Sequence, residues 1–203
     1  MNQKIYNILL LPLLLPIVML SGCVENTNQQ AVPTSSTELQ NSSTVQITDM
    51  MGRQLTVPAE ISSVIGTSSP SAILVYMLAP DKLAGWNSKQ NFTQPFMDEN
   101  YSNLPVIGNW LGSKTGNYET IIDMHPDIVI ESTATNGETN EAIERRQENL
   151  GSIPVVAIND SILFVTQSDS TIEYVGKLLN CEAQAKKLIE FRSSILNEIN
   201  STV

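Results

Sequence analysis

The sequence predicts an α/β fold with a mainly parallel sheet, an N-terminal β-hairpin and a long C-terminal helix. Short apolar runs alternate with segments of helical character from residue 64 to residue 200, and this alternation is typical of βαβ units. Strand candidates such as residues 128–130 are β-branched throughout, as expected of parallel strands that are buried on both faces.

The composition excludes several classes of partner. The chain has 203 residues and a formal net charge of −10, with 11 Lys and Arg against 21 Asp and Glu. Binding of nucleic acid requires a basic stripe that neutralises phosphates, and this acidic chain lacks one. An anionic membrane surface would not attract the chain by charge either. One His and two Cys are too few for a closed zinc or iron–sulfur site, which needs about four such ligands. We therefore expect no nucleic acid, no protein-held metal and no cofactor.

Residues 1–22 predict a signal peptide. Lys4 lies in a short polar start, and residues 8–20 form an apolar run. This run is too short for a spanning helix of about 20 residues but is typical of a secretory signal. The sequence LSGC at 20–23 resembles the lipobox of exported lipoproteins, which makes Cys23 the expected lipidation site, and a plain signal peptide with a chance Cys is the alternative. Two acyl chains on Cys23 would give stable membrane anchoring.

Residues 24–44 predict a disordered polar tether. Fourteen of these twenty-one residues are Ser, Thr, Asn or Gln, and only Glu25 and Glu38 are charged. Such a segment buries too little apolar area to offset its ordering entropy. Behind a lipidated Cys23 it would hold a folded domain at the outer face of the cytoplasmic membrane. Cys181 then has no partner for a disulfide, and we expect a structural thiol there.

The predicted lobe spans residues 45–181 and begins with a hairpin. Residues 45–48 and 55–57 alternate in polarity around a turn that contains Gly52. A short buried strand at 64–66 leads into a helix that ends at residue 78. Ser69 is its expected N-cap, with Pro70 at the first helical position.

The rest of the lobe repeats the strand and helix pattern. The expected strands are residues 83–86, 128–130 and 154–158, and the expected helices are residues 118–124, 138–150 and 169–179. Ligands of parallel sheets meet the loops beyond the carboxyl ends of the strands. Those loops are residues 67–69, 86–91, 132–136 and 159–161, which carry short polar side chains and a Trp.

The sequence matches known catalytic motifs poorly. The segment GNWLGSKTG at 108–116 has the wrong glycine spacing for a phosphate loop, and Ser113 stands where Lys should be. His125 precedes a Pro and is expected to end a helix instead of serving a Ser-His-Asp device. Glu119 and Glu131 would form a hydrolytic pair only at a separation of about 5 to 9 Å, and an acid in a first helical turn, such as Glu119, is favoured by the helix dipole.

The two tryptophans lie outside any helical stripe. Trp86 ends a strand, and for it core packing and ligand contact are both open. Trp110 lies in a Gly-rich loop, which favours exposure toward a bulky, partly apolar ligand.

The last helix is expected over residues 182–200 and would be about 30 Å long. Its partner could be the same domain or a second one. One stripe of this helix carries Ala185, Leu188, Ile189, Ile195, Leu196 and Ile199.

Several segments together resemble a known family. They are ITDMMGRQLTVP at 47–58, LPVIG at 104–108, GNYETIIDMHPDIVI at 116–130 and IPVV at 153–156. In this order they resemble the lipoprotein substrate-binding proteins of ABC importers for iron–siderophore complexes and vitamin B12. The resemblance covers residues 45–200, and its combination with a lipobox and a polar tether makes it specific.

The resemblance implies two Rossmann-like α/β lobes joined by one long helix, with the ligand in the cleft between them. It also implies docking on an ABC permease, which works with an ATPase, through an acidic residue that pairs with permease arginines; the matching position is Glu119. By position, the expected ligand contacts of this lobe are Thr67, Ser68, Ser69, Trp86, Asn87, Trp110, Ser132, Thr133 and Asn159.

Residues 182–203 resemble the inter-lobe helix of the family. The departure from the family is that no second lobe follows in this sequence, so we expect an N-terminal lobe only. The expected function is binding of a metal chelate for import, first an iron(III)–siderophore complex and second cobalamin, without enzyme activity. A metal that arrives already chelated needs no His or Cys cluster. Two alternatives remain: a membrane-tethered interaction module with an exposed apolar patch, and an exported hydrolase with His125 beside an acid and a nucleophile.

Overall fold

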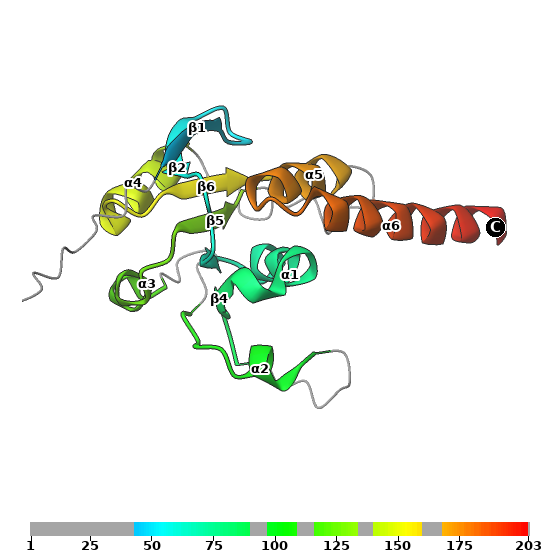
Figure 1. The fold of residues 1–203 in the computed structure, drawn as a ribbon, viewed down its shortest axis with the longest axis horizontal. Coiled ribbons are helices and arrows are strands. Elements are labelled where there is room, and N and C mark those ends of the chain that lie inside the picture. Colours follow the sequence, from blue (N-terminus) through cyan, green and yellow to red (C-terminus); the bar gives the residue numbers. More distant parts are fainter. Residues whose placement is uncertain (1–42, 90–96, 109–115, 134–139, 160–167, 203) are drawn as a thin grey trace, which may run out of the picture. The chain divides into compact units, whose positions relative to one another are not determined.

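A parallel four-stranded sheet lies at the centre of the protein (Figure 1). The computed structural model describes residues 43–89, 97–108, 116–133, 140–159 and 168–202. The strands of the sheet are β3 (Val64–Gly66), β4 (Leu83–Gly85), β5 (Ile128–Ser132) and β6 (Val155–Ile158), in the order β4-β3-β5-β6. All neighbouring pairs are parallel, as the sequence predicts.

Helices cover both faces of the sheet. Helices α1 (Ser69–Leu78), α5 (Ser168–Leu178) and α6 (Glu182–Thr202) pack on one face, and α3 (Tyr118–Met124) and α4 (Asn140–Leu150) pack on the other.

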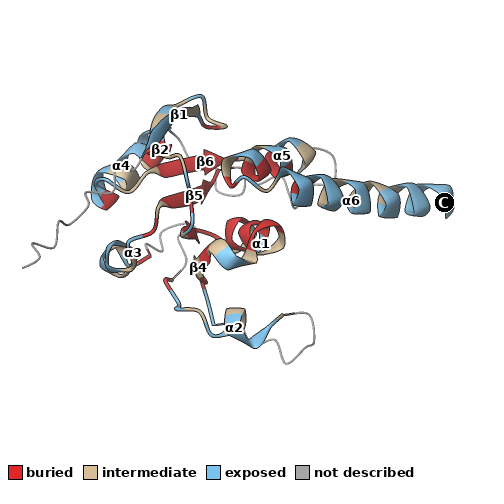
Figure 2. Cartoon of the chain, in the orientation of Figure 1, coloured by how far each residue is buried: buried red, intermediate tan, exposed pale blue. Residues whose placement is uncertain are grey.

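The alternation of side chains along each strand separates the core into two clusters. Ile128 and Ile130 point into the cluster with α1 and α5, whereas Val129 between them points into the cluster with α3 and α4. All three are fully buried, and Figure 2 shows the buried residues concentrated in the strands and in the inner faces of the helices. A sheet that is buried on both faces favours nearly continuous apolar runs in its strands.

An antiparallel hairpin precedes the sheet. It consists of β1 (Thr44–Thr48) and β2 (Gln54–Pro58), which form a separate two-stranded sheet. A 3₁₀ turn (Pro80–Lys82) leads into β4, and a short helix α2 (Glu99–Ser102) follows it.

The predicted N-cap of α1, Ser69, is wrong by one residue. The N-cap is Ser68 and not Ser69, because the Ser68 hydroxyl accepts the backbone N–H of Ser71 and the Ser71 hydroxyl in turn accepts the backbone N–H of Ser68. This reciprocal capping box closes the first turn. The turn from β3 into α1 is tight, since a Cβ at Gly66 would lie 2.5 Å from the backbone nitrogen of Ala72.

Helices α5 and α6 pack closely because Gly176 faces Ala185. The carboxyl end of α5 is held by Lys82, whose ammonium donates to the carbonyl oxygens of Leu179 and Ile61 at 2.8 Å each. Cys181 is half-buried beside this contact, and burial raises the pKa of its thiol. Within the described residues, no helix has both the length and the apolar character to cross a membrane.

Candidate functional site

The carboxyl edge of the parallel sheet brings together residues from distant parts of the chain. The backbone N–H of Thr67, after β3, donates to Ile130 O at 3.0 Å, and the N–H of Thr133, after β5, donates to Ile158 O at 3.0 Å. Because the strands are parallel, the residues that follow them meet at one edge.

A buried hydroxyl cluster joins β3 to β5 at this edge. The Ser68 hydroxyl donates to the Ser132 hydroxyl at 2.7 Å and lies 3.1 Å from the Ser71 hydroxyl. Ser68 and Ser132 are both fully buried. Ser132 is the last residue of β5 and not the first loop residue that the sequence predicts, because β5 continues through Glu131. The cluster fixes the start of α1 against the end of β5.

Asn87 has a defined orientation at the same edge. Its amide nitrogen donates to the carbonyl oxygens of Gly66 at 2.9 Å and Gly108 at 3.3 Å. Since both partners only accept, the amide oxygen must point the other way. That oxygen is buried and has no partner among the described residues. A buried amide oxygen without a donor is costly, so this position is suited to a ligand or water that donates a hydrogen bond.

The residues of the edge differ in accessibility. Thr67 is fully buried and Thr133 is nearly so, whereas Ser69 and Asn159 are half-buried. The Asn159 backbone is held on both sides: its N–H donates to the Met50 sulfur at 3.4 Å, and its carbonyl oxygen accepts the Thr171 hydroxyl at 2.5 Å. Of the predicted contacts that the structure describes, Ser69 and Asn159 are therefore the most accessible from solvent.

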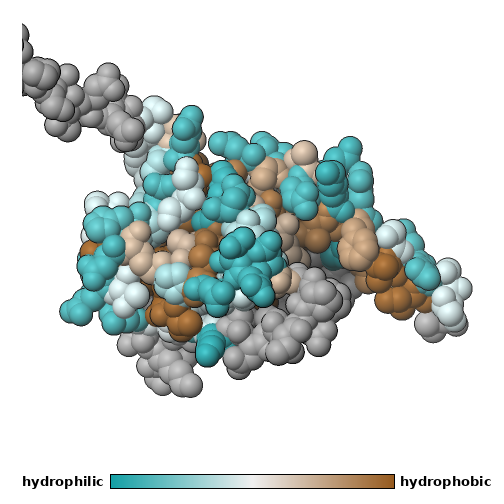
Figure 3. All heavy atoms as spheres, turned by 60° about the horizontal axis from the view of Figure 1, so that its bottom comes forward, coloured by the Kyte–Doolittle hydropathy of each residue, from teal (hydrophilic) through white to brown (hydrophobic). Residues whose placement is uncertain are grey.

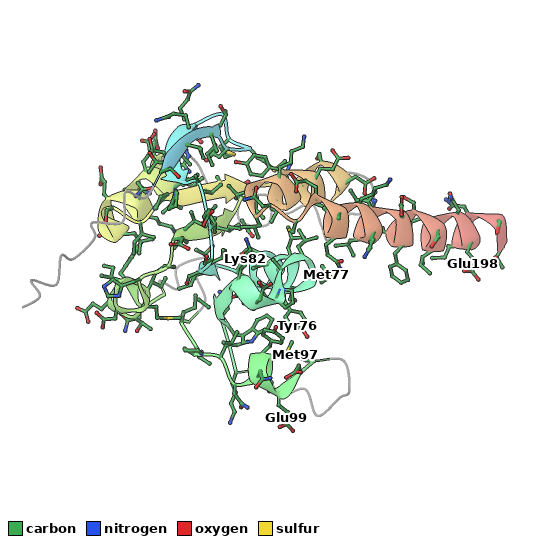
Figure 4. All side chains as sticks on the ribbon, in the orientation of Figure 1. Tyr76, Met77, Lys82, Met97, Glu99 and Glu198 are labelled. Carbon is green, nitrogen blue, oxygen red and sulfur yellow. The ribbon has the colours of Figure 1, made fainter. Side chains whose placement is uncertain are left out.

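Trp86 is buried in the core at 2% exposure. Its indole N–H donates to Tyr101 O at 2.7 Å, and its ring centroid lies 5.6 Å from that of Tyr76. Tyr76 is labelled in Figure 4, where it points from α1 toward Met97. Of the two interpretations left open by the sequence, this geometry favours core packing for Trp86. Trp110 and Cys23 lie outside the described residues.

The two carboxylates that could suggest hydrolysis have separate environments. Glu131 is fully buried on β5 and forms an ion pair with Arg146 of α4. Glu119 is exposed in the first turn of α3. Glu131 therefore has a structural partner, and Glu119 is accessible to another protein.

His125 ends α3 in the left-handed conformation, with φ of 48°. One ring nitrogen lies 2.8 Å from Asp123 O. The carboxylate of Asp127, which lines the same hollow of the surface, accepts the backbone N–H groups of Ser62 and Ser63 at 2.6 and 2.9 Å. His125 and Asp127 are thus each bonded to backbone, as expected of a helix end.

The hydrogen-bond network of the hairpin turn was not predicted. The Asp49 carboxylate accepts from the Arg53 guanidinium at 2.7 Å, and Arg53 also donates to Val155 O at 2.6 Å. The N–H of Met50 donates to Ala157 O at 3.1 Å. These turn residues satisfy the free edge of β6 and so position the segment that leads to Asn159. The DMMGR sequence indicates a turn, and nothing in it indicates a partner a hundred residues away.

The predicted ligand contacts that the structure describes at this edge all carry uncharged side chains. Among the residues that the structure describes, no group of three or more His, Cys, Asp or Glu could hold a metal ion. The edge presents hydroxyl and amide groups, which suit an uncharged or internally neutralised surface of a ligand.

A family model described as "Periplasmic binding protein" matches residues 64–203. Among curated proteins, none matches the chain. Solved structures do match. An ABC transporter solute-binding protein from Sulfurospirillum deleyianum has a TM-score of 0.60 at 23% identity, with 75% of this chain and 47% of that chain covered.

Two further structures have similar scores. The molybdate-binding protein MolA of Haemophilus influenzae has a TM-score of 0.56 at 18% identity, over 72% of this chain and 49% of its own. Staphylococcus aureus SirA, complexed with staphyloferrin B, has a TM-score of 0.53 at 18% identity, over 72% of this chain and 46% of its own. The chain therefore spans about half the length of these structures, and at these identities the likeness concerns the fold.

Proposed function

Because the chain belongs to the family of periplasmic binding proteins, we propose that it supplies the N-terminal ligand-binding lobe of an ABC importer for a metal chelate, first an iron(III)–siderophore complex. The observation that carries the proposal is the polar carboxyl edge, where Ser69, Asn87 and Asn159 follow three different strands. Such groups bind the organic shell of a chelate and leave the metal to the chelator. SirA, which has this fold, is complexed with staphyloferrin B.

Titration of the purified chain from residue 24 onward tests the ligand class. We expect ferric siderophores to quench tryptophan fluorescence with weak affinity, because one lobe offers half of a cleft, and cobalamin to have no effect. Asn159→Ala should weaken that binding, whereas Asn149→Ala, an exposed position on α4, is the matched control. Selective binding of cobalamin would replace the siderophore assignment, and tight binding by this chain alone would contradict the half-site.

Helix α6 is proposed to join this lobe to a second one. It runs past the amino end of α5, and its outer part exposes Phe191 by 65%, Ile195 by 41% and Ile199 by 54%. Figure 3 shows this hydrophobic surface on the outer part of α6. Met77 of α1 and Leu188 of α6 line a groove of ≈ 310 Å³ next to it. Sequencing of the DNA after the Val203 codon tests the proposal, since an in-frame second α/β lobe is expected there.

Membrane attachment is proposed to occur through Cys23, with residues 24–44 as the tether. Replacing Cys23 with Ser should release the protein from the membrane fraction and abolish incorporation of labelled fatty acid. In this proposal the wild-type chain is held at the outer face of the cytoplasmic membrane by its lipid and not by a spanning helix. Retention of the Cys23→Ser variant in the membrane fraction would contradict this proposal.

Docking on the permease is proposed to use Glu119. Its carboxylate is exposed on α3, where a permease arginine could form a charge-assisted pair. Glu119→Arg should reduce stimulation of the transporter ATPase by at least tenfold without altering ligand binding. Glu148→Arg, an exposed position on α4, is the matched control for the added charge. Equal effects of the two substitutions would point to general charge repulsion and contradict a specific role of Glu119.

A further inference from the structure

The outer edge of β1 has no strand beside it among the described residues. Sheet pairing of β1 involves β2 alone, in the register Thr44↔Pro58 to Thr48↔Gln54. Figure 1 shows β1 as the outermost element of the hairpin, on the side away from β6.

The hydrogen-bond pattern identifies the backbone groups that this edge presents. The N–H of Asp49 donates to Arg53 O, and the N–H of Ala59 donates to Ser43 O, both at 2.9 Å. Bonded and non-bonded pairs alternate in an antiparallel ladder. The pairs that contain Val45 and Ile47 are therefore bonded to β2. The N–H and C=O groups of Thr44, Gln46 and Thr48 point outward, away from β2.

The edge lacks the features that usually prevent pairing with another strand. Natural edge strands are protected by charged side chains, by Pro or by bulges. Strand β1 has the sequence TVQIT, with no charge and no Pro, and its register with β2 has no bulge. Val45 is 43% exposed on this strand.

The strand is self-complementary. Around a two-fold axis at Gln46, an antiparallel copy sets Thr44 opposite Thr48 and Val45 opposite Ile47. The outward-pointing residues then form the bonded pairs, and the Val–Ile pairs occupy the non-bonded positions, where side chains are closest. We propose that β1 pairs with β1 of a second copy of this chain, so that two hairpins form one continuous four-stranded antiparallel sheet.

The association is expected to be weak. Two strands of five residues bury less than the roughly 1,200 Å² that is typical of stable complexes. The proposed anchoring of both copies to one membrane would raise their effective concentration. The surface is independent of the ligand-binding edge, since it lies on the hairpin and not at the carboxyl end of the parallel sheet.

Sedimentation equilibrium of the chain from residue 24 onward, over a concentration series, tests the proposal. Wild-type protein should show a reversible monomer–dimer equilibrium. Gln46→Lys and Gln46→Glu each place like charges on the two-fold axis and should raise the dimer dissociation constant by at least about tenfold. An equimolar mixture of the two variants should restore association as a heterodimer. Gln54→Lys adds the same charge to exposed β2 and should leave the equilibrium unchanged.

Three results would overturn the proposal. The first is a wild-type protein that stays monomeric up to about millimolar concentration. The second is failure of the mixed variants to associate, which would exclude a two-fold axis at Gln46. The third is an equilibrium that Phe191→Lys abolishes and Gln46→Lys does not change, because the interface would then be the apolar face of α6.

Discussion

The carboxylate of Asp49 accepts a hydrogen bond from the backbone N–H of Ala157 at 3.2 Å, although the two residues are 108 positions apart. The same carboxylate accepts the N–H groups of Met51 and Arg53 at 3.0 and 2.9 Å. One buried side chain therefore closes the hairpin turn and joins the turn to the edge of the parallel sheet.

Replacement of Asp49 with Ala should lower the free energy of unfolding by about 3 kcal/mol or more, because the Arg53 guanidinium loses its charge partner while it is still 11% exposed. Asp49→Asn should cost less, since the amide oxygen can still accept backbone N–H groups. Gln54→Ala, on the exposed side of β2, is the control. Urea unfolding measures all three, and a loss below about 1 kcal/mol for Asp49→Ala would contradict the proposed link.

Gly66→Ala should destabilise the protein by about 3 kcal/mol, because the new methyl group would lie within 3 Å of the backbone of α1. Gly52→Ala is the matched comparison: its φ of +80° disfavours Ala by about 1 kcal/mol, but nothing lies within 4 Å of the added group. Urea unfolding of the two variants separates steric overlap from backbone strain. Equal losses would show that overlap at Gly66 is relieved by a small shift of α1.

Tyr174 makes a pH-dependent contribution to the free energy of unfolding. Burial, together with the nearby Asp49 charge, raises the pKa of its phenol to about 12, and Arg53 opposes this shift. The folded protein therefore holds the phenolic proton more firmly than the unfolded chain does. The contribution to stability is complete below pH 10 and is lost as the pH rises from 10 toward 12.

The Tyr174→Phe variant has no phenol to titrate, so it should lose less stability than wild type as the pH rises from 10 toward 12. The wild-type hydroxyl is buried and has no partner among the described residues, so the substitution should cost little at neutral pH. The difference in unfolding free energy between wild type and Tyr174→Phe, measured up to pH 12, should change in favour of the variant. A constant difference across this range would contradict the raised pKa.

Lys82→Met should lower the free energy of unfolding by about 2 kcal/mol, because two buried carbonyl oxygens lose a charged donor. It should also slow alkylation of Cys181, since the Lys82 charge lowers the pKa of that thiol. Lys186→Met is the control: its contact with Glu190 at 3.8 Å is exposed and contributes little. Unchanged reactivity of Cys181 in the Lys82 variant would contradict the electrostatic coupling.

The local pattern of the sequence predicts the strands and helices well, because both faces of the sheet require apolar residues. Residues 118–124 form the predicted helix, with Asn117 as its cap. The predicted N-cap of α1 was wrong by one residue, because Ser68 and Ser69 are equally suitable as N-caps by residue type. Only the reciprocal bond with Ser71 distinguishes them.

Tertiary contacts explain what the sequence could not show. Glu131 continues a buried strand because Arg146 pairs with it, and this partner is invisible in a run of β-branched residues. The ligand contacts remain predictions. The structure adds that Ser68 and Ser132 are bonded to each other, whereas Ser69 and Asn159 are more accessible.

The contacts between the hairpin turn and β6 have a consequence for biosynthesis. During translation, β1 and β2 emerge about a hundred residues before the Ala157 group to which Asp49 binds. A two-stranded hairpin by itself is marginally stable, and contacts of such long sequence separation form late. The hairpin is therefore made before the rest of the lobe, and its turn is fixed against the parallel sheet only after β6 has been made.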